Sequence, residues 1–133
     1  MDITMQHVGK HAGTVWKTLE QQGSLSEKKL EQNTKLSTDE LHSAIGWLAR
    51  EGKIGQQENT YYIGDTNLTP RIGKNAGMIW KILDIWEEAD ITSITHLARI
   101  DKTDAYAALG WLAREGKIMT TMKKKKSYYV LKE

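Results

Sequence analysis

The chain has 133 residues, with a formal net charge of +2 and no cysteine. Hydrophobic residues at 39% and charged residues at 27% are ordinary for a folded globular protein, which argues against a disordered chain. The lack of cysteine excludes disulfides, thiolate zinc sites and cysteine nucleophiles. The first residues have neither a secretory signal pattern nor a stretch long enough to span a bilayer, so we expect a cytoplasmic protein with no membrane contact.

One stretch of nine residues, Gly-Trp-Leu-Ala-Arg-Glu-Gly-Lys-Ile, occurs twice, at 46–54 and at 110–118. Aligned at an offset of 64, residues 9–54 and 73–118 match without a gap, and 17 of the 46 positions are identical. A repeat of this length indicates duplication of a structural unit. The sequence therefore predicts two domains, copy one at 1–64 and copy two at 65–133. Units of this size are near the lower limit for independent folding, so each copy is expected to depend on contact with the other for its stability.

The charge is divided unevenly between the copies. Residues 1–66 contain seven Lys and Arg against nine Asp and Glu, whereas residues 67–133 contain twelve against eight. Much of the excess lies in one run, Lys123 to Lys126. A uniformly basic nucleic-acid-binding protein would not show this division.

The first segment of each copy is predicted to be an amphipathic helix. In copy one, over about 5–22, Ala12, Val15, Trp16 and Leu19 have the spacing of one helical face. In copy two, the helix is expected to begin with Thr69 as N-cap and Pro70 as the first helical residue. The linker between the copies then covers only about residues 64–68.

Two further helices follow in each copy. Ser26 and Asp90 are expected to cap short second helices, and a turn near Lys35 or Arg99 leads to a third helix. In copy one, the third helix opens with Ser37-Thr38-Asp39-Glu40, which has the pattern of a capping box.

The nine-residue repeat is predicted to end the third helix, with Gly52 as a left-handed stop, and to start a strand. The β-prone runs at 61–63 and 128–130 then complete a hairpin in each copy. The second hairpin is three residues longer, and Lys123 to Lys126 occupy its tip. The order of three helices and a hairpin predicts a mainly α fold with small β-hairpins (α+β), in two tandem winged helix-turn-helix domains.

The residues at 12–16 and 44–54, with their second copy, resemble a family of small prokaryotic winged-helix domains. The resemblance covers nearly the whole chain and implies the winged-helix fold, but it supplies no catalytic or binding residues. Two such domains in one chain also resemble the tandem winged-helix subunits of larger assemblies, some of which bind proteins rather than DNA.

In a helix-turn-helix protein that reads double-stranded DNA, the start of the third helix enters the major groove. The candidate contact residues are Thr38, His42 and Ser43 in copy one, and Lys102, Thr103 and Tyr106 in copy two. Copy two is the better candidate, because Asp39 and Glu40 would repel phosphate in copy one. If a third helix is buried, that copy cannot read DNA without rearranging.

The hairpin tip of copy two has two interpretations. Lys123, Lys124, Lys125 and Lys126 would give about four phosphate contacts and a log–log salt slope near −3.6. Alternatively, these lysines only keep an exposed hairpin soluble and prevent edge pairing.

Several apolar residues suggest an interface. Trp47 and Trp111, at the edge of each third helix, either complete a domain core or form a contact between domains or chains. In the first helix of copy two, a second apolar stripe consists of Met78, Ile82, Ile85 and Trp86, where copy one has polar residues. A solvated helix normally buries one face, so copy two is expected to contact copy one, a second chain or another protein, unless it only has a larger core.

Catalytic chemistry is poorly supported. His7 and His11 have no apparent third metal ligand, and there is no nucleophile arrangement or phosphate-binding glycine loop. We therefore expect no enzyme activity, no metal and no cofactor. Two hypotheses remain, namely a DNA-binding protein with a role in transcription regulation and a non-catalytic protein-interaction or scaffold module.

Overall fold

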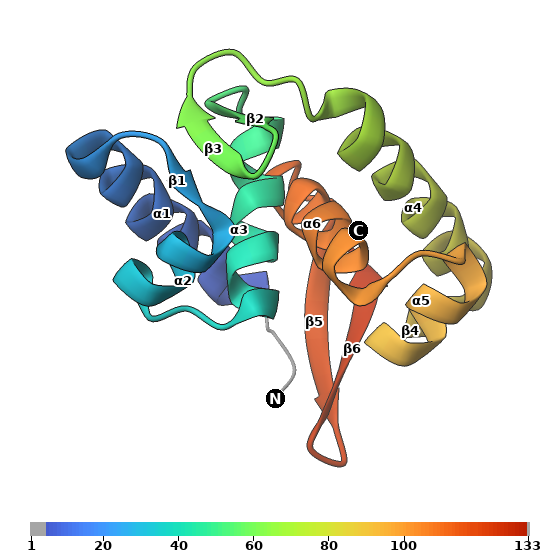
Figure 1. Ribbon diagram of the computed structural model, residues 1–133. Coiled ribbons are helices and arrows are strands. Elements are labelled where there is room, and N and C mark those ends of the chain that lie inside the picture. Colours follow the sequence, from blue (N-terminus) through green and yellow to red (C-terminus); the bar gives the residue numbers. More distant parts are fainter. Residues whose placement is uncertain (1–4, 133) are drawn as a thin grey trace.

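The computed structural model describes residues 5–132 (Figure 1). Copy one consists of η1 (Met5–His7), α1 (Val8–Gln22), β1 (Leu25–Ser26), α2 (Glu27–Thr34), α3 (Thr38–Arg50), β2 (Ile54–Gln57) and β3 (Thr60–Ile63). Copy two consists of η2 (Thr69–Gly73), α4 (Lys74–Trp86), β4 (Glu88–Ala89), α5 (Ile91–Ala98), α6 (Lys102–Arg114), β5 (Ile118–Lys123) and β6 (Lys126–Leu131). This order confirms two winged helix-turn-helix domains in a mainly helical fold.

Local caps fix the starts of four helices. The Ser26 hydroxyl accepts a hydrogen bond from the Lys29 backbone N–H, and the Asp90 carboxylate accepts one from the Ser93 N–H. The predicted capping box is present at the start of α3, where Ser37 and Glu40 each accept a hydrogen bond from the other's backbone N–H. In copy two, the Asp101 carboxylate caps α6 by accepting a hydrogen bond from the Asp104 N–H. Each cap satisfies a backbone donor that the helix itself leaves unpaired.

The third helices end at the predicted glycines. Gly52 and Gly116 have φ angles of 73° and 72°, in the left-handed region that glycine adopts at little cost. The N–H of Lys53 then donates to the carbonyl of Leu48, and that of Lys117 to the carbonyl of Leu112. The doubled stretch therefore forms the joint between third helix and wing, as expected.

The entry to α4 differs from the prediction. The N-cap residue is Leu68, whose side chain makes no capping hydrogen bond. Thr69 is already the first residue of the helical turn η2, and Pro70 is the second. Leu68 is buried, with only 4% of its surface exposed. Apolar burial at this position explains why the helix begins one residue earlier than the Thr-Pro pattern suggests.

Each wing belongs to a three-stranded antiparallel sheet, in the orders β1-β3-β2 and β4-β6-β5. The third strand in each sheet, β1 or β4, has only two residues and was not predicted. Leu25 pairs with Tyr61 and Ala89 with Tyr129, and both tyrosines are buried. Burial raises the pKa of Tyr61 to about 12, because the phenolate would lose its hydration.

Each of the two hydrophobic cores includes residues from the other copy. Met5 and Val8 of copy one pack in the core of copy two, and Leu68 and Ile72 pack in the core of copy one. Val8 and Ile72 occupy equivalent positions, 64 residues apart, so the exchange is reciprocal. Domains of this size are marginal alone, and each core here is completed by residues of the other copy.

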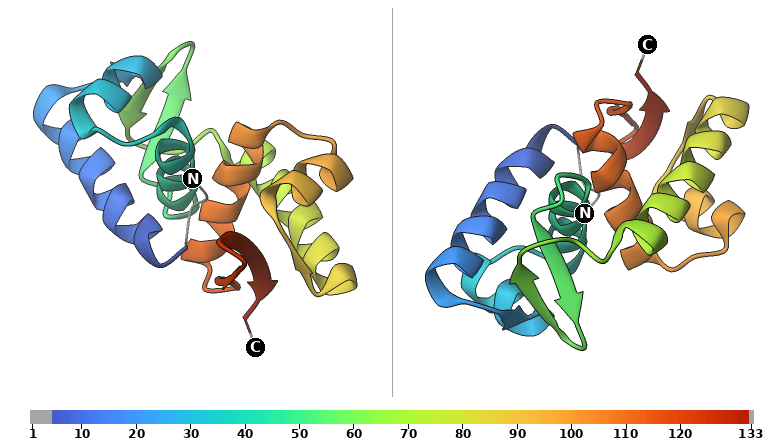
Figure 2. Two further views of the ribbon diagram at one scale, coloured as in Figure 1. Left: turned by 90° about the horizontal axis from the view of Figure 1, so that it is seen from below. Right: turned by 90° about the horizontal axis from the view of Figure 1, so that it is seen from above.

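The third helices α3 and α6 lie side by side at the centre of the molecule (Figure 2). Both views place α1 on the outer side of α3 and α4 on the outer side of α6. The sheets lie beyond the ends of the central pair, and the β5–β6 hairpin projects from the body (Figure 1).

Candidate nucleic-acid interface

The contact between α3 and α6 depends on two glycines. A Cβ atom added to Gly46 would lie 1.7 Å from the carbonyl oxygen of Ala107, and one added to Gly110 would lie 1.9 Å from that of Ser43. Glycine is therefore required at both positions for the two backbones to approach. The paired contacts are those of a two-fold symmetric interface, in which residue i meets j and j meets i.

Reciprocal ion pairs border this contact. Arg50 Nε lies 3.0 Å from Glu115 Oε2, and Arg114 Nε lies 2.9 Å from Glu51 Oε2. The two arginine side chains are almost half exposed, so each pair contributes modestly, about 1 kcal/mol or less. Arginine and glutamate of the doubled stretch thus join the copies, and nothing in the sequence indicated that Glu51 and Glu115 would be partners across the repeat.

The two tryptophans of the doubled stretch lie at the same junction. Trp47 and Trp111 are half-buried and pack against both hydrophobic cores. The guanidinium of Arg114 lies 5.7 Å from the Trp47 ring centroid, and that of Arg50 lies 5.7 Å from the Trp111 centroid. Each ring therefore adds to a core and also lies against an arginine of the other copy.

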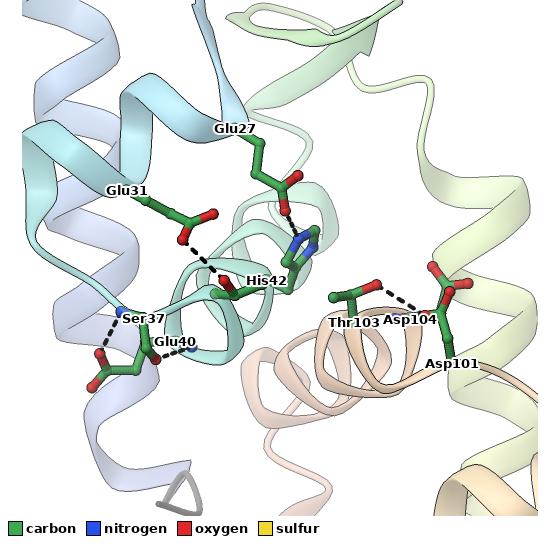
Figure 3. Close-up of polar contacts among 9 residues, drawn as sticks. Glu27, Glu31, Ser37, Glu40, His42, Asp101, Thr103 and Asp104 are labelled. Carbon is green, nitrogen blue, oxygen red and sulfur yellow. Dashed lines mark hydrogen bonds and ion pairs between the residues drawn. The ribbon is translucent and has the colours of Figure 1, made fainter.

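The start of α3 is occupied by contacts within the chain (Figure 3). The Thr38 hydroxyl donates to a Glu31 carboxylate oxygen at 2.9 Å, and His42 contacts the carboxylate of Glu27. Ser43, which was predicted to face a nucleic acid, is fully buried. The two candidates here that are not fully buried, Thr38 and His42, therefore each contact a carboxylate.

The start of α6 is also engaged. Lys102 Nζ lies 3.2 Å from Asp39 Oδ2 in copy one, and the Thr103 hydroxyl donates to Asp101 at 2.9 Å. Tyr106 is fully buried. In this arrangement neither Ser43 nor Tyr106 presents a surface to a base edge.

Two carboxyl groups at this end of α6 respond oppositely to their surroundings. Burial, together with the nearby charge of Asp101, raises the pKa of Asp104. The backbone N–H of Asp104 donates to Asp101, and this bond with that from Thr103 lowers the pKa of Asp101. Asp101 therefore stays charged at the start of α6, and a carboxylate there repels phosphate.

The wing of copy two divides its four lysines into two pairs. Lys123 Nζ lies 2.6 Å from Glu88 Oε1, and Lys126 Nζ lies 2.7 Å from Asp90 Oδ2. The hydrogen bond from Lys126 lowers the pKa of Asp90 to about 2. These two lysines thus tie the hairpin to β4 and to the start of α5.

Lys124 and Lys125 form the turn at the tip. Both side chains are exposed, and neither forms an ion pair with any residue of 5–132. Their φ angles are 51° and 66°, in a region that most side chains avoid and that hairpin turns usually fill with Asn or Gly. The turn therefore presents two solvated ammonium groups at the end of the projecting hairpin (Figure 1).

The additional apolar stripe of α4 is only partly covered. Met78 and Ile82 are half-buried, whereas Ile85 and Trp86 keep 74% and 59% of their surface exposed. The main contact between copies is formed by α3 and α6 instead. Contact of Ile85 and Trp86 with a second chain or another protein stays a prediction.

Within residues 5–132, no set of three or more His, Cys, Asp or Glu side chains is arranged to hold a metal ion. None of the helices in this range is both long enough and apolar enough to cross a membrane.

Comparison with known proteins identifies the family of the chain. A search of curated proteins finds no match. Among solved structures, the chain is similar to the mRNA-binding domain of elongation factor SelB from E. coli, which was solved in complex with SECIS RNA, with 16% identity, a TM-score of 0.38, and coverage of 92% of this chain and 98% of that one. The family model "Winged helix-turn-helix domain (DUF2582)" matches twice, at residues 1–63 and 66–131. The chain belongs to this winged helix-turn-helix family and contains two copies of its domain.

Proposed function

We propose that the chain is a non-catalytic, cytoplasmic protein that binds double-stranded DNA through the phosphate backbone, with the wing of copy two as the main contact. The observation that supports this proposal is the hairpin tip, where Lys124 and Lys125 are exposed beyond the body of the protein while their neighbours are held by carboxylates. Ammonium groups that contact phosphates release counterions, and this release favours binding to any duplex sequence.

The third helices are not part of the proposed contact. Their facing surfaces are packed against each other around Gly46 and Gly110, and the exposed parts of their first turns lie beside carboxylates. A role in transcription regulation requires preference for one DNA sequence. That preference would depend on separation of α3 from α6, or on selection of a DNA shape by the wing.

The salt dependence of binding to a mixed-sequence duplex tests the proposal. Two phosphate contacts give a log–log slope of about −1.8, compared with about −3.6 for four. Replacing both Lys124 and Lys125 by Ala is expected to abolish most of this slope. Replacing Lys123 and Lys126 by Ala serves as the matched control, because these lysines are paired within the protein and their loss is expected to change the slope less. Absence of binding at low salt, or binding indifferent to the Lys124/Lys125 replacement, contradicts the proposal.

A second candidate function is supported by the exposed apolar residues of copy two. Ile85, Trp86 and Leu97 are 74%, 59% and 40% exposed, and Trp86 and Leu97 line one pocket of about 250 Å³. Exposed apolar groups gathered in this manner are typical of protein contacts. Under this alternative, the chain is a scaffold that associates with itself through these residues.

Sedimentation velocity over a range of protein concentrations separates the candidates. Self-association that disappears when Ile85 and Trp86 are both replaced by Ser supports the scaffold. A chain that stays monomeric at every concentration contradicts association through this surface.

A further inference from the structure

A pocket of about 330 Å³ lies between α4, the end of α6 and the start of β5. Nine residues line it, and each is identical to the residue 64 positions earlier in copy one. Over the aligned region, by contrast, only 17 of 46 positions are identical. The identity between copies is therefore concentrated on this surface as well as on the joint between third helix and wing.

Some of this identity follows from the fold. Trp111 packs against the cores and lies 3.4 Å from the position of a Cβ at Gly73. Lys81 and Lys117, by contrast, are exposed. Packing does not explain why both lysines are identical to their counterparts, Lys17 and Lys53.

Gly77 is the most informative member of the pocket. It lies inside α4 and is exposed. Apart from its two chain neighbours and the backbone of its own helix, no atom of the described residues lies within 4 Å of a Cβ placed there. Gly13 in copy one has the same surroundings. A helix-interior glycine weakens the helix relative to alanine, and here neither a close backbone contact nor a positive φ requires it. Its lack of a side chain leaves the backbone of α4 open to a group from outside.

The pocket combines an aromatic surface with positive charge. Trp80 is 39% exposed, and Lys81 and Lys117 line the same pocket. The single carboxylate, Glu115, is already paired with Arg50 at 3.0 Å and with Lys117 at 3.5 Å. Lys81, Lys117 and Arg50 thus bring three positive charges to the pocket, and Glu115 brings one negative charge. The pocket therefore suits an anionic ligand with a flat apolar part.

We propose that this pocket binds one nucleotide, with the base stacked on Trp80 and the phosphate near Lys81 and Lys117. Base stacking on an aromatic side chain beside cations is the usual way in which proteins hold unpaired nucleotides. The volume lies at the lower end of the range for small-ligand pockets, which fits one nucleotide better than an extended peptide. Gly77 allows the sugar or base to lie against the helix. This site is separate from the wing and does not depend on the proposed duplex binding.

The equivalent surface of copy one is expected to bind more weakly. Lys53 Nζ lies 5.9 Å from the Trp16 ring centroid and 3.6 Å from Glu51, so it stands over the aromatic surface. A nucleotide would first have to displace this lysine. Copy one thus provides a natural control for copy two.

The test uses the full chain and the replacements Gly77→Leu and Gly13→Leu. Leucine favours helix and meets open space at either position, so both variants are expected to fold, which thermal unfolding checks. Binding of a short single-stranded oligonucleotide and of free mononucleotides is followed by the indole N–H signals in NMR spectra, with Trp80→Phe identifying the Trp80 signal. We expect shifts of the Trp80 signal, at least tenfold weaker binding for G77L, and less than threefold for G13L.

The outcomes distinguish the possible ligands. If an oligonucleotide binds much more tightly than a mononucleotide, the ligand is a single-stranded nucleic acid. Equal affinities instead identify a free nucleotide as the ligand. An acidic peptide without aromatic residues that shifts the Trp80 signal with equal affinity overturns the proposal, as does unchanged binding in G77L or no binding of any nucleotide. Because the Lys124/Lys125 double replacement is expected to keep the Trp80 response, a failure of duplex binding is distinguishable from a failure of this site.

Discussion

Gly46 and Ala107 meet backbone to backbone, so that a Cβ at Gly46 would stand 1.7 Å from the Ala107 carbonyl oxygen. Because the obstructing atom belongs to the backbone of a helix, no side-chain rotation can relieve such a clash. The whole contact between α3 and α6 would have to open. The burial of the two third helices therefore depends on two glycines that the duplication has kept identical.

Replacing Gly46 by Ala is expected to lower the free energy of unfolding by about 2–4 kcal/mol, because overpacking against backbone cannot relax locally. Urea unfolding followed by circular dichroism measures the change. Gly13→Ala is the matched control, since its Cβ meets open space, and this variant is expected to gain up to about 1 kcal/mol from helix propensity. Equal stability of G46A and the wild type would show that the helices do not pack in this manner.

Local signals in the sequence were sufficient for most of the fold. The caps at Ser26, Asp90 and Ser37 and the left-handed stop at Gly52 each depend on side chains within four residues, and the structure contains all of them. The short strands β1 and β4 were missed because two residues carry no periodicity. Their pairing is set by contact with Tyr61 and Tyr129, far along the chain.

The packing of α3 on α6 was not predicted. A glycine within a helix allows another group to approach closely, but the sequence does not show which group that is. In the sequence Gly46 and Gly110 only stand beside the two tryptophans, whereas the group that approaches each glycine in the structure is the other third helix. A polar residue at the start of a third helix also looks exposed in sequence, yet Ser43 is buried by the other copy. Periodicity identifies a buried face but not which element covers it.

Ser43 offers a test of both burial and function. Its hydroxyl is buried and has no hydrogen-bond partner within the part of the chain that the structure describes. Copy two has Ala107 at the equivalent position. Ser43→Ala is therefore expected to raise the free energy of unfolding by about 1 kcal/mol, since an unsatisfied polar group is removed. Duplex binding is expected to stay unchanged, and a loss of affinity in this variant would show that α3 reads DNA after all.

The reciprocal ion pairs are expected to contribute equally. A double-mutant cycle on Arg50 and Glu115, with each residue replaced by Ala, is expected to give a coupling of about 0.5–1 kcal/mol. The cycle on Arg114 and Glu51 is expected to give the same value, because the two pairs have nearly equal geometry and exposure. Both couplings are expected to fall at high salt. A clear difference between the cycles would contradict the two-fold character of the interface.

Asp90 is expected to make the free energy of unfolding fall at acidic pH. Its pKa is about 2 in the folded protein, below the ordinary value of 3.8, because Lys126 donates a hydrogen bond to it. A lowered pKa means that the stabilisation is fully present above about pH 4 and is lost as the pH falls through about 2. Asn is an equally good N-cap, so Asp90→Asn removes the charge and keeps the cap.

At pH 7 this variant is expected to lose about 1–2 kcal/mol of unfolding free energy, less than the full shift implies because Lys126 is half exposed. The difference from the wild type is expected to shrink towards zero near pH 2. Glu88→Gln is the control, since it breaks the more exposed pair with Lys123 and is expected to cost less than about 0.5 kcal/mol. Urea unfolding at a series of pH values measures both variants. A loss in D90N that is the same at pH 7 and pH 2 would show that the charge of Asp90 does not stabilise the wing.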